Sequence, residues 1–209
     1  DVISGQTALA ATPADTDELL ISDGGVIKRI DYSYIKSDPT HVLLSTTNVT
    51  SGVSEVDITS NIDSTYKCYM ITCTGLSSTA NANFAIQLYK GGSLDTGSVY
   101  DSYLSFYNAD DSGGGGSTNK QTNNSSMIFT DEFGEEAENT GNFILYIFDP
   151  SNTATDTRLG GNIYYSRGDT TTKGSFTGRI EETAAVDGIR FKFLSGNIDG
   201  GQFKLYGIN

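Results

Sequence analysis

Apolar and polar residues alternate with a period of two over much of the chain. The clearest runs are residues 84–89 and 189–193, and residues 203–206 close the chain in the same way. Such alternation predicts strands with one buried and one wetter face. Clusters of Gly, Asn, Ser and Asp separate the runs and are typical of turns. No window keeps a helical stripe, and we expect residues 130–139 to form at most a short surface turn.

About ten short strands of this kind follow one another between residues 41 and 209. Their regular spacing predicts an all-β fold, an antiparallel jelly-roll-like β-sandwich. Residues 143–148 are apolar on both faces, so this strand should lie either in a central buried position or against a second subunit. The glycine-rich run at residues 110–117 predicts a flexible surface loop.

The first forty residues differ in kind from the rest. Residues 18–31 predict two short strands around an Asp-Gly-Gly turn. A lone hairpin is marginal in water, so it needs a partner, either the sandwich or copies of itself in an oligomer. We place a boundary after Asp38 and Pro39, which gives an N-terminal stem (residues 1–40) and a C-terminal sandwich domain (residues 41–209). The chain lacks an initiator Met, which is consistent with a C-terminal piece of a longer or processed protein.

The chain is strongly acidic. Its 209 residues hold 13 Lys+Arg and 26 Asp+Glu, a formal net charge of −13. Such a field repels polyanions, so we expect no nucleic acid and no anionic membrane surface as a partner. No run approaches the ~20 apolar residues of a membrane span, and we expect no membrane insertion. Cys68 and Cys73 are five residues apart, which places them on opposite faces of a strand as two reduced thiols.

Nothing in the sequence points to catalysis. His41 is the single histidine, and no Gly-x-Ser-x-Gly turn accompanies it. Residues 131–138 are rich in carboxylates, which glycan cleavage requires, but such a run is more typical of a solvated loop. Residues 108–113 copy the first half of a calcium loop, yet Asn119 stands where a bidentate Glu belongs. We therefore predict no enzyme, no metal and no cofactor.

Tyrosine placement is more informative. Alternation over residues 100–107 puts Tyr100, Leu104 and Phe106 on one face, and Asp101, Tyr103 and Tyr107 on the other. The second face is polar enough for water, and exposed rings beside carboxylates suit sugar binding. We predict Tyr103, Tyr107 and Asp101 as a ligand-binding set. A cross-strand aromatic pair or a subunit contact is the alternative explanation of these rings, and the adjacent Tyr164 and Tyr165 raise the same alternatives.

Three segments carry a resemblance to a known group of proteins. Residues 17–31, residues 62–66 with the following hydrophobic strand, and residues 195–208 resemble segments of virion structural proteins of tailed phages, marine ones especially. The resemblance implies an all-β homotrimer on the tail or capsid surface, joined to other virion proteins through its N-terminal stem. It names no catalytic residue.

The resemblance leaves three functions open. The first is a tail-fibre or tip module that binds a host-surface polysaccharide during adsorption. The second is a purely architectural part, such as a head decoration or a tail connector. The third is a polysaccharide depolymerase spike, which the lack of catalytic signals disfavours.

Overall fold

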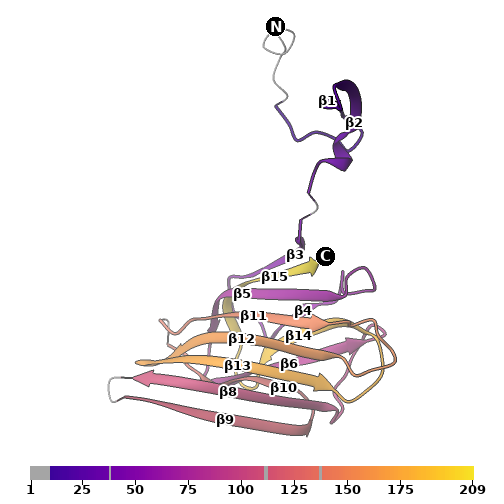
Figure 1. Ribbon diagram of the computed structural model, residues 1–209. Coiled ribbons are helices and arrows are strands. Elements are labelled where there is room, and N and C mark those ends of the chain that lie inside the picture. Colours follow the sequence, from indigo (N-terminus) through magenta and orange to yellow (C-terminus); the bar gives the residue numbers. More distant parts are fainter. Residues whose placement is uncertain (1–9, 38, 111–112, 137) are drawn as a thin grey trace. The chain divides into compact units, whose positions relative to one another are not determined.

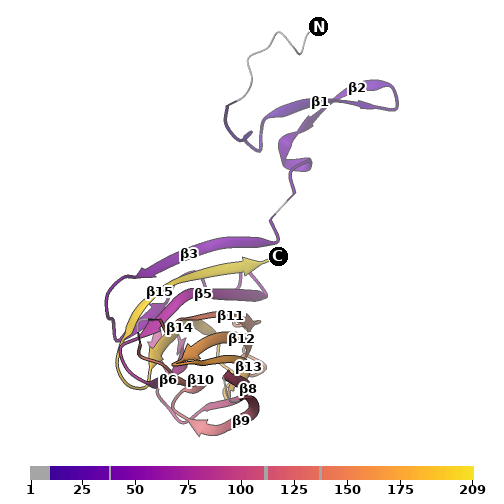
Figure 2. The ribbon, with the colours of Figure 1, turned by 90° about the vertical axis from the view of Figure 1, so that its left-hand side faces the viewer.

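The computed structural model describes residues 10–37, 39–110, 113–136 and 138–209, and the chain divides into two compact units between Pro39 and Thr40. In the first unit, β1 (Glu18–Asp23) and β2 (Val26–Asp31) form an antiparallel hairpin, followed by the 3-10 turn η1 (Tyr32–Tyr34) (Figure 2). The turn residues Gly24 and Gly25 have φ of 58° and 80°, which a two-residue hairpin turn of this kind requires. The predicted hairpin is confirmed.

Both faces of this hairpin carry exposed apolar side chains. Leu20 and Ile27 lie on one face and are 78% and 67% exposed, and Leu19 and Ile21 lie on the other. Nothing within the described part of this unit covers these side chains. A two-stranded hairpin without such cover is marginally stable.

The second unit is an antiparallel sandwich of two sheets, as predicted. The five-stranded sheet has the order β10 (Met127–Phe133), β6 (Ala82–Lys90), β14 (Val186–Phe193) and β4 (Glu55–Ile58), with β7 (Ser93–Leu94) paired to β6. The eight-stranded sheet has the order β3 (His41–Val49), β15 (Ile198–Ile208), β5 (Cys68–Ser78), β11 (Gly141–Phe148), β12 (Arg158–Arg167), β13 (Thr170–Ile180), β8 (Tyr100–Asp110) and β9 (Gly113–Asn124) (Figure 1).

Eight of these strands follow the jelly-roll path. One half-sheet is β3-β15-β5-β11 and the other is β4-β14-β6-β10, and the chain crosses between them at each step except from β6 to β10. Two hairpins are inserted into this framework: β8–β9 between β6 and β10, and β12–β13 between β11 and β14. Both insertions extend the first half-sheet beyond β11.

The core between the sheets is aromatic. Phe84 lies at its centre, with ring centroids of Phe129, Phe143, Phe191 and Phe193 within 4.9–6.4 Å. All five rings are buried. Burial of this much apolar surface is the main favourable term in folding.

The two cysteines lie on opposite faces of β5, as predicted. Cys73 is buried in the core, and Cys68 is half-buried on the outer side. Both thiols are free. Burial raises the pKa of the Cys73 thiol far above its usual range, so this group stays protonated at neutral pH.

Two local predictions need correction, and a third, for the strand at residues 143–148, is confirmed only in its central position. The run expected to be a flexible loop, residues 110–117, contributes residues 113–117 to β9, because backbone pairing with β8 makes a strand even where no side chain is apolar. The surface turn expected from residue 130 onward begins instead as the end of β10, with Thr130 buried. Residues 143–148 lie in the central strand β11, but the outer side chains Ile144 and Phe148 remain 42% and 48% exposed.

Candidate functional site

Cross-strand pairing aligns the outward side chains of the eight-stranded sheet into rows. One row contains Leu43, Tyr206, Met70, Tyr146, Gly160, Thr177, Tyr103 and Lys120. The part of this outer face on β3, β15, β5 and β11 carries most of the apolar residues. The part on the two inserted hairpins is polar and carries the two predicted tyrosines.

The predicted division of β8 into two faces is confirmed. Tyr100 and Leu104 are fully buried, whereas Tyr103 and Tyr107 are 45% and 67% exposed on the outer face. The two exposed tyrosines are four residues apart along the strand, which corresponds to ~13 Å. Their rings are therefore separate contact points rather than an aromatic pair.

Tyr103 and Asp101 line one hollow, of about 220 Å³, together with Lys120, Arg158 and Arg179. Tyr107 lines a neighbouring hollow with Ser105 and Gly116 on the paired strands β8 and β9. The structure thus brings Asp101 and Tyr103 together and places Tyr107 farther along the same face.

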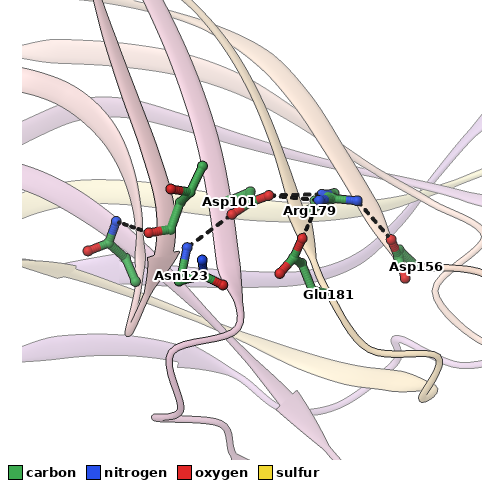
Figure 3. Close-up of polar contacts among 7 residues, drawn as sticks. Asp101, Asn123, Asp156, Arg179 and Glu181 are labelled. Atoms are coloured by element: carbon green, nitrogen blue, oxygen red, sulfur yellow. Dashed lines mark hydrogen bonds and ion pairs between the residues drawn. The ribbon is translucent and has the colours of Figure 1, made fainter.

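Asp101 belongs to a network of charges at the end of β13. Its Oδ2 accepts hydrogen bonds from Arg179 Nη2 at 2.8 Å and Nε at 3.1 Å, and its Oδ1 accepts one from the backbone N–H of Asn123 at 3.1 Å. Arg179 also contacts Asp156, at 3.3 Å, and Glu181 (Figure 3). The Arg179 guanidinium holds the pKa of Asp101 below its usual range, and Asp101 in turn raises the pKa of Arg179.

Both oxygens of Asp101 already accept hydrogen bonds from the protein. We therefore assign Asp101 to holding β8, β9 and β13 in place beneath the hollow. The polar groups that remain available to a ligand there belong to other residues, above all Lys120 and Arg158, which make no ion pair with the described residues.

Sequence reasoning missed Lys120 and Arg158. Lys120 stands in a polar run that carries no strand signal of its own, so nothing in its neighbourhood assigns it to a sheet face. Arg158 begins β12, and only the pairing of Arg158 with Arg179 brings it to the hollow.

A second hollow, of about 480 Å³, lies toward the apolar part of the outer face. Ile144, Tyr164, Lys204 and Tyr206 are among the residues that line it. Tyr164 is 48% exposed, whereas its neighbour Tyr165 is buried. Of these two tyrosines, only Tyr164 is exposed and could contact a ligand or a subunit, whereas Tyr165 belongs to the core.

Beside this hollow, apolar side chains reach solvent. Leu43 is 53% exposed, and the rings of Tyr146 and Phe148 stack with centroids 6.1 Å apart on β11. Contiguous exposed apolar surface on a soluble protein often marks an interaction site.

The other candidates for chemistry do not assemble into a site. His41 begins β3, is exposed, and has Thr40 Oγ1 3.1 Å from its Nδ1. The carboxylate run is divided between β10, where Glu132 pairs with Arg167 at 2.6 Å, and an exposed turn.

The calcium-loop half-motif includes Asp111 and Ser112, which lie outside the described residues. Within the described residues, no group of three or more His, Cys, Asp or Glu side chains is placed to hold a metal ion. The same residues contain no helix with the length and apolarity that a bilayer crossing requires.

Comparison with known proteins gives little. No protein-family model matches the chain, and no curated protein sequence matches it significantly. Among solved structures, the chain is similar to an exo-inulinase from Aspergillus awamori, with 13% identity and a TM-score of 0.34. The match covers 92% of this chain and 34% of the inulinase chain. The chain thus spans about a third of that protein.

Proposed function

We propose that this protein is a non-enzymatic module of a phage virion, of the tail-fibre or tip type, that binds a host-surface polysaccharide. The observation that carries the proposal is the pair of exposed tyrosines, Tyr103 and Tyr107, on a polar sheet face with hollows beside both rings. A ring offers an apolar surface to the face of a sugar, and nearby polar side chains supply hydrogen bonds to its hydroxyls. The virion context rests on the resemblance of the terminal segments.

The binding site would be repeated in a homotrimer. The hairpin β1–β2 has apolar side chains on both faces and no cover within its own unit, so copies of the same hairpin are its natural partners. In this proposal the stem also joins the module to other virion proteins. Several weak sites on one symmetric particle raise the avidity without new contacts.

The test is the substitution of both rings, Tyr103→Ala with Tyr107→Ala, in the whole chain. We expect glycan-array binding to be lost while the unfolding free energy stays within about 1 kcal/mol, as for exposed positions. The control is Tyr34→Ala, which removes an exposed ring from the other unit. Unchanged binding by the double variant would place the site elsewhere, and release of free sugar by the wild type would indicate a depolymerase.

One observation favours a second candidate, a purely architectural virion part. Leu43, Ile144 and Phe148 are about half exposed on the outer face, and another virion protein could cover them. The position of this protein in the density of an intact particle separates the two. A tip position supports the binding module, whereas a head position or a site between other tail proteins supports the architectural role.

A further inference from the structure

The positive charges of this acidic chain are unevenly distributed. Eight of its 13 Lys and Arg residues form ion pairs with carboxylates of the described residues. The other five do not: Lys120, Arg158, Lys173, Lys192 and Lys204. Four of these five lie on the outer face of the eight-stranded sheet, and only Lys192 lies elsewhere, on β14 of the other sheet.

Carboxylates are nearly absent from the same face. The cross-strand rows run from His41 to Asp101 at one edge and from Asn48 to Gly116 at the other, and Asp101 is the one carboxylate at their outward positions. Asp101 is already paired with Arg179. Within these rows the described residues therefore include no unpaired carboxylate; the exposed Asp199, near the start of β15, lies beyond them.

We propose that the outer face of the eight-stranded sheet binds an acidic polysaccharide, one whose sugars carry carboxylate or sulfate groups. This inference rests on the proposed function and names the class of its ligand. Two hollows on the face combine a half-exposed tyrosine with an unpaired cation, whereas no cation lines the hollow beside Tyr107. Tyr103 stands with Lys120 and Arg158 in the first hollow, and Tyr164 stands with Lys204 in the second.

The arrangement suits a chain rather than a small anion. Across the sheet the two hollows are about three strand spacings apart, roughly 14 Å at the usual distance between neighbouring strands, and they are also offset from each other along the strands. Lys173 lies on β13 beside the second hollow, with Tyr107 and Tyr164 as its cross-strand neighbours. A charged polymer lying diagonally across the strands would meet a ring and a cation at each end.

The net charge of −13 does not oppose this binding at physiological salt. Charges more than about 8 Å from the ligand are largely screened there, so the cations next to the ligand dominate. The net negative charge repels a polyanion at long range, but at this face the local cations attract it.

The test compares two single variants that remove the same charge. Lys120→Gln takes one cation from the outer face, and Lys192→Gln takes one from the other sheet, so both variants reach the same net charge. Binding to alginate, a polyuronate, is measured by biolayer interferometry at about 0.15 M NaCl, with carboxyl-reduced alginate as the neutral control. Unfolding midpoints of both variants verify that the fold is intact.

We expect wild type to bind alginate and not its reduced form. Lys120→Gln should weaken binding roughly 2- to 5-fold, as for a single exposed charge pair, and Lys192→Gln should leave it unchanged. The triple variant of Lys120, Arg158 and Lys173 to Gln should lose on the order of 10-fold or more.

Other outcomes overturn the inference in distinguishable ways. Equal binding of both alginate forms overturns the acidic class and leaves the proposed glycan binding intact. Equal weakening by Lys192→Gln removes the assignment to this face. Binding of single-stranded DNA as tight as that of alginate would show that the face responds to charge without sugar. Failure to bind any glycan on an array removes the proposed function together with the inference.

Discussion

The position of the Tyr107 ring can be tested without removing the ring. Tyr107 lies across the cross-strand neighbour Gly116, where an added Cβ would lie 2.8 Å from Cε1 and 3.1 Å from Cδ1 of the ring. Carbon atoms in contact are normally ~3.5–4.0 Å apart. Gly116→Ala therefore displaces the ring by up to about 1 Å, and solvent on its other side leaves room for the movement.

The fold should tolerate this change. Gly116 has no left-handed φ, so alanine fits the backbone and restricts the unfolded chain, a gain of ~0.4–1 kcal/mol. An off-rotamer tyrosine costs ~0.5–1.5 kcal/mol. The two terms nearly cancel, and we expect the unfolding free energy to change by less than about 1 kcal/mol.

Ligand binding should suffer more than stability. If sugar stacking on Tyr107 is worth about 1 kcal/mol, comparable to an aromatic pair, then its loss weakens each site about 5-fold. Three sites acting together on a trimer would lose on the order of 100-fold in avidity. Titration calorimetry with a short glycan measures the first quantity, and adsorption of the trimer to cells measures the second.

Gly115→Ala is the matched control, because a Cβ there meets no atom within 4 Å and the residue likewise has an ordinary φ. Gly115→Ala should bind like wild type. The reasoning is refuted if Gly116→Ala binds as tightly as Gly115→Ala, because a displaced ring would then make no difference.

Three further predictions concern stability and assembly. Asp101→Asn removes a carboxyl whose pKa is lowered by Arg179. The wild type should therefore be more stable than the variant above about pH 4, and this advantage should shrink as the pH falls through the lowered pKa. Urea unfolding at several pH values measures the stability difference, and an advantage that grows on acidification contradicts the prediction. Phe84→Ala should cost about 3–5 kcal/mol in the same assay, since four buried rings surround Phe84, and a cost below about 1 kcal/mol contradicts the aromatic core. Leu20→Glu with Ile27→Glu should reduce the sedimenting mass from three times 22.3 kDa to one chain, and a wild-type monomer contradicts the trimer.

The fold could be predicted largely because alternation is a local property. Along β8 it assigned Tyr100 to the core and Tyr103 to the outer face without reference to any other strand. The same logic placed the two cysteines on opposite faces. It failed for β9, where a Gly- and Asn-rich run forms an edge strand because its neighbour β8 supplies the hydrogen bonds.

The site was less predictable because alternation states which face a residue occupies and not which strand lies next to it. Asp101 and Arg179 are 78 residues apart in the chain, and the pairing of β13 with β8 brings them together. Lys120 and Arg158 join them only through the order β12-β13-β8-β9. The concentration of unpaired cations on one face likewise depends on which carboxylates fold beside which cations, and the net charge conceals it.

The two inserted hairpins carry outward residues whose sequence can change, whereas the eight strands of the jelly-roll path carry the core that the fold requires. The hairpin β8–β9 is inserted between β6 and β10 of the jelly-roll path, and the hairpin β12–β13 is inserted between β11 and β14. Outward substitutions on these hairpins, away from the Asp101–Arg179 network, cost little stability, usually within ~0.5 kcal/mol, because the packing residues of these strands point the other way. A lineage of such proteins could therefore exchange ligand specificity by drift of a few outward positions, and an engineer could graft a new recognition surface onto the same framework.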